Sequence, residues 1–110
     1  MFIDSHCHLD FPEYQDRLPE VLENMVRANV SHALCISVDI PDFPKVKKLA
    51  HTYPNLFASV GVHPDYEETP EPTFEFLVEE AKDDKVIAIG ETGLDYYRMG
   101  DRSYDSMEWQ

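Results

Sequence analysis

Residues 33–38 read ALCISV, a short apolar run between polar neighbours, and this kind of segment decides the fold. Similar runs recur along the chain at a spacing of roughly 25 to 30 residues. They occupy residues 1–3 (MFI), 56–60 (LFASV) and 86–89 (VIAI). Short runs of mostly β-branched or aromatic residues, bounded by polar residues or glycine, are typical of strands buried in a parallel sheet. The sequence therefore predicts four buried parallel strands.

Amphipathic stretches separate these runs and predict three helices. In the first stretch the apolar residues follow the i, i+3, i+4, i+7, i+8 spacing of a helix with one packed face: Leu18, Val21, Leu22, Met25 and Val26. Residues 43–53 and 74–81 repeat the pattern. Pro19 marks the start of the first helix, and Pro54 ends the second. Strands that alternate with helices predict an α/β fold with right-handed crossovers, and a further helix start is expected within residues 105–110.

Composition limits the classes of protein to consider. The chain has 110 residues, 22 acidic and 9 basic, and a formal net charge of −13, which fits one ordinary domain. No stretch approaches the ~20 apolar residues of a membrane span, and the first residues do not resemble a signal peptide. The sequence therefore predicts a cytoplasmic location, no membrane partner, and reduced thiols at Cys7 and Cys35. The charge disfavours unaided binding to a polyanion.

Polar side chains follow each predicted strand, at the edge where parallel α/β folds bind ligands. His6 and His8 follow the first strand, Asp39 the second, His63 the third and Glu91 the fourth. Because the carboxyl ends of parallel strands meet at one edge of the sheet, these residues are expected to converge on one rim.

The His6-Cys7-His8 sequence is the most specific local feature. In extended backbone, residues two apart point to the same side, so both imidazoles reach one cation while Cys7 points away. Borderline divalent cations accept imidazole and carboxylate together, and Glu91 would supply the carboxylate, which could also bridge to a second ion. Such a site would activate a water molecule for hydrolysis.

Each of the other candidates also has a purely structural interpretation. Glu91 could instead stabilise a helix N-terminus or be a solvated acid, and His63 could be a loop histidine fixed by the proline that follows it. Asp39 is better explained as a turn or cap residue, and the acidic residues 65–84 as the solvated side of the third helix. Residues 96–98 (YYR) could stack on a nucleotide, but packing is the favoured interpretation.

Three motifs in order resemble the TatD family of metal-dependent deoxyribonucleases, within the amidohydrolase-like metal hydrolases: DSHCHLD at residues 4–10, GVHP at 61–64 and GETGLDYY at 90–97. The resemblance implies a TIM-type barrel with one or two divalent ions at its carboxyl face, where Mg²⁺, Mn²⁺ and Zn²⁺ are not distinguished. It also implies hydrolysis of phosphodiester bonds, typically from the 3′ end of DNA. By position, His6 and His8 would bind the first ion, Glu91 would bridge the pair as the catalytic carboxylate, and His63 would contact substrate phosphate or support the ligands.

The chain is short for this family, because a (β/α)₈ barrel has about 250 residues. The predicted fold is therefore the N-terminal half of such a barrel, about four parallel strands and three helices, in a single incomplete domain over residues 1–110. The family's later metal-binding histidines and aspartate have no counterpart. The favoured hypothesis is a truncated deoxyribonuclease or other phosphodiesterase. The alternatives are a non-enzymatic half-barrel that self-associates through the open edge of its fourth strand, and a metal hydrolase of small molecules.

Overall fold

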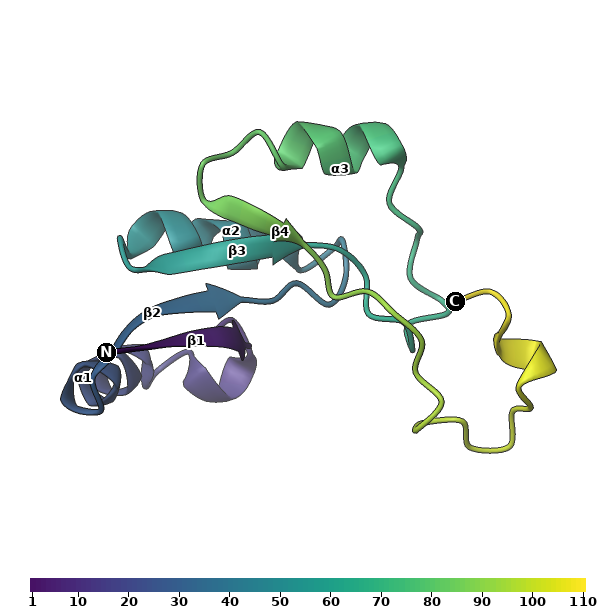
Figure 1. Cartoon of the computed structure of the whole chain (residues 1–110), viewed down its shortest axis with the longest axis horizontal. Coiled ribbons are helices and arrows are strands. Elements are labelled where there is room, and N and C mark those ends of the chain that lie inside the picture. The colour runs from purple at the N-terminus through teal and green to yellow at the C-terminus, as the bar shows by residue number, and fades with distance from the viewer.

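Four strands and three helices alternate in the computed structural model, which describes residues 1–110 (Figure 1). Two short 3₁₀ turns add to them, one near each end of the chain. The elements are β1 (Phe2–Cys7), a 3₁₀ turn (Pro12–Tyr14), α1 (Leu18–Arg27), β2 (Val30–Cys35), α2 (Phe43–Thr52), β3 (Leu56–Val60), α3 (Phe74–Glu80), β4 (Val86–Ile89) and a second 3₁₀ turn (Asp105–Met107).

The strands form one parallel sheet in the order β1-β2-β3-β4, so that neighbours in sequence are neighbours in space. This order, with a helix in each crossover, confirms the predicted α/β class and the arrangement of half a (β/α)₈ barrel. The bounds of β3 and β4 agree with the two predicted runs.

The first two strands differ from their predicted bounds. β1 continues to Cys7, well beyond the apolar residues 1–3, because pairing with β2 persists until Cys7 lies opposite Cys35. β2 begins at Val30 and ends three residues before the apolar run does. Backbone hydrogen bonding, which is independent of side-chain polarity, sets these ends. As a result His6 lies inside β1 and not after it.

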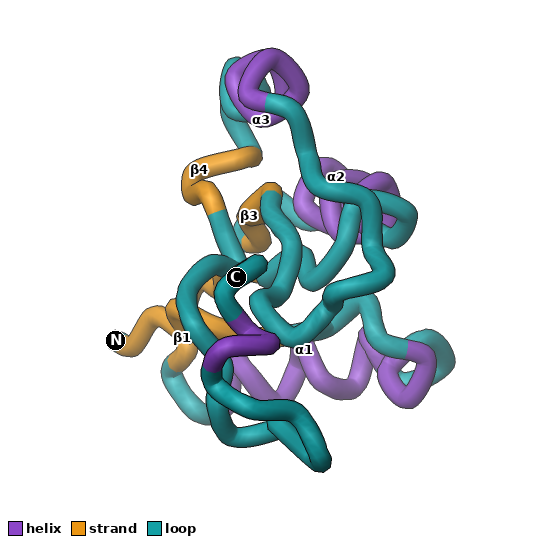
Figure 2. The backbone as a smooth tube through the Cα atoms, turned by 90° about the vertical axis from the view of Figure 1, so that its right-hand side faces the viewer, coloured by secondary structure: helices purple, strands orange, loops and turns teal.

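All three helices lie on one side of the sheet, as Figure 2 shows in a view along the strands. The core forms between that side of the sheet and the helices, above all α2. It comprises Leu9, Ala33, Cys35, Phe43, Val46, Ala50, Leu56, Ala58, Val60 and Val86. The prediction that all four strands are buried is wrong for β1 and β4. Phe2 and Ile87 are 67% and 58% exposed, because nothing covers the second face of the sheet at its two outer strands.

The helices agree with their predicted positions but not always with their predicted faces. In α3 the pattern predicts that Phe74 is packed, yet its side chain is 75% exposed. Phe76 and Leu77 pack against the core in its place. The helix begins where the Thr73 hydroxyl accepts a hydrogen bond from the Phe76 N–H. None of the helices has the length and hydropathy needed to cross a membrane.

The segment after β4 extends beyond the carboxyl ends of the strands, on the side to which the strand arrows point in Figure 1. It contains a single 3₁₀ turn where the sequence predicts the start of a longer helix. Met107 in that turn is fully buried. Arg102 ties the segment to the loop after β3, since its Nη2 donates to Asp65 Oδ1 at 2.6 Å.

Two buried serines join the carboxyl ends of the three strands β2, β3 and β4. The Ser59 hydroxyl accepts from the Ser37 N–H at 3.0 Å and donates to the Gly90 carbonyl at 2.8 Å. The Ser37 hydroxyl in turn contacts the Gly61 carbonyl at 3.2 Å. Both serines have no exposed surface. Their hydrogen bonds fix the backbone from which the residues of the rim project.

The close approach of Gly61 and Gly90 gives the first prediction. A Cβ at Gly61 would lie 2.5 Å from the carbonyl carbon and oxygen of Gly90, whereas a Cβ at Gly90 would meet only the Thr92 nitrogen, at 3.9 Å. Backbone atoms cannot rotate away as a flexible side chain can. We expect Gly61→Ala to lower the free energy of unfolding by roughly 2–3 kcal/mol, measured by urea denaturation. Gly90→Ala is the matched control and should cost less; equal losses would show that the close approach is unimportant.

Candidate metal centre

Three of the predicted site residues meet at one rim of the sheet. His6, His8 and Glu91 each present a ligand atom, and these atoms all lie within 4.8 Å of one another. His6 Nε2 is 3.3 Å from His8 Nε2 and 3.7 Å from Glu91 Oε2. β1 and β4 are the outer strands of the sheet, and three inter-strand spacings place them roughly 14 Å apart. The side chains from both edges lean over the same face of the sheet. The predicted convergence of these three residues is confirmed.

The alternation along β1 separates the histidines from the thiol, as predicted. Cys7 Sγ points to the opposite side, where it lies 3.4 Å from the Leu34 carbonyl oxygen and 3.8 Å from Cys35 Sγ. Both cysteines are free thiols, in agreement with the sequence. Cys7 is therefore outside the candidate ligand set even though it lies between two of its members.

His8 is held in the orientation that a metal ligand needs. Its Nδ1 lies 3.1 Å from the Ile36 carbonyl oxygen, and its ring stacks on Phe11 with centroids 4.7 Å apart. Because a carbonyl only accepts hydrogen bonds, the proton of the neutral ring is on Nδ1. Nε2 then offers its lone pair towards His6. A hydrogen bond of this type commonly fixes the tautomer of a metal-binding histidine.

The backbone of Glu91 is fixed by its neighbours in the sheet. Its N–H donates to the Ser37 carbonyl at 3.0 Å, and Gly90 before it is held by the Ser59 hydroxyl. The two carboxylate oxygens face different partners: Oε2 faces His6, and Oε1 lies 3.5 Å from His63 Nε2. A carboxylate placed in this way is able to serve two positive or hydrogen-bonding groups at once.

His63 joins the rim with a different protonation pattern. Its Nδ1 accepts a hydrogen bond from the Asp65 N–H at 3.0 Å, so that the neutral ring carries its proton on Nε2. That N–H faces Glu91 and also Asp95, whose Oδ2 is 3.9 Å away. In this tautomer Nε2 has no lone pair for a metal ion. His63 is therefore a hydrogen-bond donor beside the ligand group, not a fourth member of it.

Asp95 is a residue of the site that the sequence analysis did not single out. Its carboxylate accepts from the Tyr97 N–H at 2.9 Å and from Arg98 Nη1 at 2.7 Å. The Tyr97 N–H and the Arg98 guanidinium hold the pKa of Asp95 below its usual range, so it is ionised at neutral pH. The sequence signal that identifies Asp95 as a candidate is its position four residues after Glu91, in the same loop.

Asp39 has a structural role, as the sequence analysis favoured, and of residues 96–98 the favoured packing is seen for Tyr96, whereas Tyr97 is 92% exposed. Asp39 Oδ1 accepts from the Asp42 N–H at 2.7 Å, which forms the turn before α2, and Asp39 does not join the ligand group. Tyr96 packs edge-on against Tyr104 with centroids 5.1 Å apart.

The distances from His6 Nε2 to the other two donors fit a divalent cation. Two ligand atoms at about 2.1 Å from one ion in tetrahedral coordination are roughly 3.4 Å apart. His6 Nε2 has neighbours at 3.3 and 3.7 Å, close to that separation. Two imidazoles with one carboxylate are also a donor set that borderline divalent metals accept. The group lies in an open depression of about 450 Å³, which His63 and Arg98 also line.

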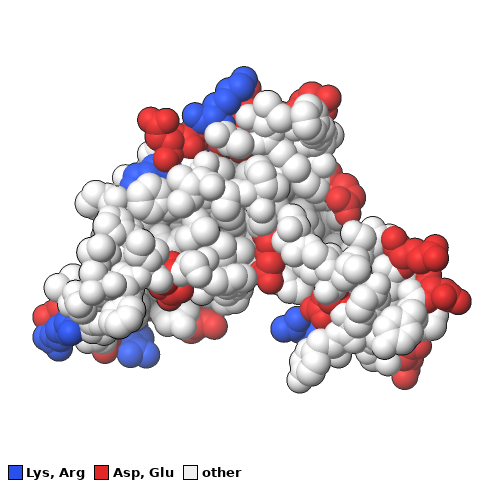
Figure 3. All heavy atoms as spheres, in the orientation of Figure 1, with Lys and Arg blue, Asp and Glu red and all other residues white.

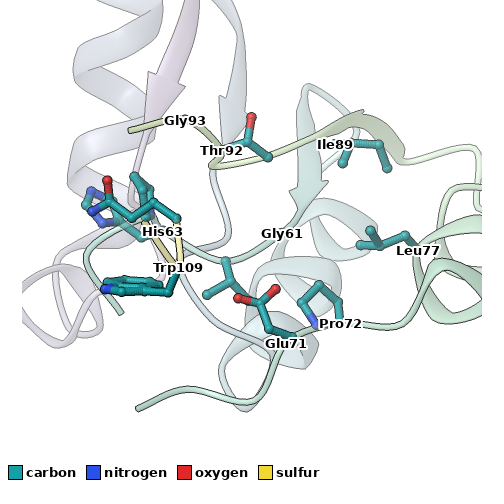
Figure 4. Close-up of a pocket in the computed structure, with 12 residues that line it drawn as sticks. Gly61, His63, Glu71, Pro72, Leu77, Ile89, Thr92, Gly93 and Trp109 are labelled. Atoms are coloured by element: carbon teal, nitrogen blue, oxygen red, sulfur yellow. The ribbon is translucent and has the colours of Figure 1, made fainter. Parts of the chain in front are cut away.

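A second depression, of about 230 Å³, lies beside the first. Figure 4 shows its walls, which include Leu77 of α3, Ile89 of β4 and Trp109 near the C-terminus. His63 lines both depressions. The mostly uncharged lining of this second depression contrasts with the histidines and carboxylate of the first.

Comparison with known proteins shows the family to which this chain belongs. Residues 3–109 match the family described as TatD related DNase. The chain belongs to the TatD family. The match covers nearly all of the chain, in agreement with the resemblance of its three motifs.

Relatives of this TatD-family chain are considerably longer than it is. A Buchnera aphidicola protein named "Uncharacterized metal-dependent hydrolase" is 39% identical over 90% of this chain and 38% of its own length. The solved structure of YjjV, a TatD homologue from Escherichia coli K12, has a TM-score of 0.79 and 31% identity over 98% of this chain and 42% of YjjV. A mouse protein named "Putative deoxyribonuclease TATDN3" is 30% identical over 86% of this chain and 35% of its own length. The chain thus spans about two fifths of the relatives that it matches.

The ligand geometry predicts how substitutions alter metal binding. We expect His8→Ala and Glu91→Gln each to weaken Mn²⁺ or Zn²⁺ binding at least roughly tenfold, because each removes a donor atom from the group. Isothermal titration calorimetry of the 110-residue chain measures this. His32→Ala is the matched control, since His32 lies in β2 outside the ligand group, where its ring is beside Ser31 and Phe57. Equal affinities for all four proteins would exclude this group as the binding site.

Proposed function

We propose that this chain forms part of a divalent-metal-dependent hydrolase of phosphodiester bonds, a deoxyribonuclease of the TatD type that acts from the 3′ end of DNA. The observation that carries the proposal is the meeting of His6, His8 and Glu91, from the two outer strands, within 4.8 Å. The names of relatives support it: two bacterial relatives are called metal-dependent hydrolases, and the mouse relative is called a deoxyribonuclease.

Each residue has a distinct role in this proposal. His6 and His8 would hold the first ion, and the Ile36 carbonyl keeps His8 in place. Glu91, whose Oε2 faces His6 and whose Oε1 faces His63, would supply the carboxylate ligand and could bridge to a second ion. When bound, such ions lower the pKa of water and neutralise charge on phosphate oxygens. His63 directs its Nε2–H at Glu91 or at a substrate phosphate oxygen.

The donor types bear on which ions the site would hold. Two imidazoles in the group favour Zn²⁺ or Mn²⁺ over Mg²⁺, which prefers oxygen ligands and retains its water molecules. We propose one tightly held ion between the histidines and Glu91. A second, weaker ion at the other Glu91 oxygen would have to displace the His63 N–H from it.

Hydrolysis assays test the proposal directly. We expect the chain to shorten 5′-labelled single-stranded DNA in the presence of Mn²⁺, and Glu91→Gln to lower the rate at least roughly 10-fold. Glu23→Gln is the control, because Glu23 is an exposed partner of Arg27 on α1. Activity that survives EDTA, or is equal in Glu91→Gln, would contradict the proposal.

Two further substrates distinguish the hydrolase hypotheses. A nitrophenyl phosphodiester and an amide, assayed beside DNA, report on small-molecule hydrolysis. Cleavage of either compound without cleavage of DNA would favour the small-molecule alternative.

A second candidate function is self-association through the open sheet. Ile87 and Ile89 of β4 and Phe2 of β1 are large apolar side chains that remain exposed, and both outer strands present unpaired backbone groups. Open apolar edges of this kind favour pairing with another chain. Two copies that paired β4 with β1 would bring eight strands together.

Sedimentation velocity tests this second candidate. We expect the chain to sediment with twice the mass of one copy, and Ile87→Lys to convert it to a monomer, because the substitution places a charge on the exposed sheet face. Val26→Lys is the matched control, since Val26 is also an exposed apolar residue but lies on α1 and not on a strand. A monodisperse wild-type monomer would show that the open sheet does not drive association.

A further inference from the structure

The depression that holds the candidate ligands contains one permanently positive side chain. Of the nine residues that line it, Arg98 alone is a lysine or arginine. Because acidic residues outnumber basic ones and the net charge is −13, the composition alone does not predict a basic side chain at this point. Figure 3 shows acidic groups in excess on the face in view, and a hollow between the sheet and the C-terminal segment.

Arg98 is held at one end and free at the other. Nη1 donates to Asp95 Oδ2 at 2.7 Å, and the Asp95 side chain is only 11% exposed. No hydrogen bond engages Nε or Nη2, and the side chain of Arg98 is 58% exposed. A guanidinium fixed through one nitrogen keeps a fork of donors that matches phosphate oxygens.

A short series of contacts connects Arg98 with the ligand group. The Asp95 oxygen that accepts from Arg98 is 3.9 Å from His63 Nε2, and His63 Nε2 is 3.5 Å from Glu91. Arg98 therefore lines the same depression as His6, His8 and Glu91. A phosphate at that position would be adjacent to the one at the metal group.

Tyr97 is placed differently from the other tyrosines of this loop. Its side chain is 92% exposed, and its ring lies 5.9 Å from the Arg98 guanidinium. Tyr96, its neighbour, packs against Tyr104. A tyrosine ring left in water beside an arginine offers a surface on which a base could stack, and such stacking needs a base that is not paired within a duplex.

We infer that Arg98 binds a backbone phosphate of a single-stranded nucleic acid and that Tyr97 stacks on an adjacent unpaired base. The inference rests on the proposed function, because it assigns the substrate contacts of the same site. Arg98 and Tyr97 would then determine specificity. The site would accept a flexible strand with bases and would bind a backbone without bases less tightly.

Oligonucleotide binding tests the inference. The probe is fluorescein-labelled pentathymidylate with phosphorothioate linkages, which resist hydrolysis, titrated at constant Mn²⁺ concentration and followed by fluorescence anisotropy. A second probe has the same linkages but no bases. We expect Arg98→Ala to weaken binding of both probes roughly tenfold and to reduce the slope of log affinity against log salt by about 0.7. Tyr97→Ala should weaken binding of the base-containing probe alone, at least about fivefold.

Matched variants separate these contacts from general effects. Arg27→Ala removes the same charge from α1, where Arg27 pairs with Glu23, and should leave both affinities unchanged. Tyr97→Phe keeps the ring and should bind as the wild type does. Circular dichroism of each variant verifies folding.

The outcomes distinguish the inference from the proposed function. If Mn²⁺ binding by the wild type requires His8 and Glu91, but Arg98→Ala and Arg27→Ala bind the probe equally, the inference is wrong and the proposed function remains. Absence of probe binding by the wild type, or equal losses of both probes in Tyr97→Ala, would also overturn the inference. A wild type that binds no Mn²⁺ and cleaves no phosphodiester would instead overturn the proposed function.

Discussion

The geometry of the rim depends on the hydrogen bonds of one buried hydroxyl, that of Ser59. It accepts from the N–H of Ser37, two residues after β2, and donates to the carbonyl of Gly90, directly after β4, so it acts both as acceptor and as donor. Buried polar groups are costly unless they are satisfied, and here each partner is satisfied by another strand end. Glu91 follows Gly90 directly, and its own N–H donates to Ser37. The position of the catalytic candidate is therefore set by backbone contacts of three strands.

Two histidines of the rim, His8 and His63, are given opposite tautomers by their backbone partners. A carbonyl accepts from Nδ1 of His8, whereas an N–H donates to Nδ1 of His63. Identical side chains thus become a lone-pair donor for a cation in one case and a proton donor in the other. The main chain, through the direction of its peptide groups, assigns these chemical roles.

Local rules were sufficient for the parts of the protein that are determined locally. The alternation of His6, Cys7 and His8 follows from the two-residue period of a strand, and the ends of β3 and β4 follow from their apolar runs. Features determined by distant partners could not be predicted in this way. The exposure of Phe74 depends on what lies opposite α3, and the role of Asp95 depends on His63 and on Arg98.

The charge of −13 is compatible with an anionic substrate once distances are considered. Acidic side chains repel a nucleic acid over long range, but at physiological ionic strength the repulsion decays over about 8 Å. Contacts inside the depression act at hydrogen-bond distance, where Arg98 and any bound cation are close and the acids of α3 are screened. Long-range steering therefore works against association, so affinity depends on short-range contacts. A chain of this composition would select its substrate through contacts at the rim itself. Added salt would accelerate association by screening the long-range repulsion, until it also screens the contacts at the rim.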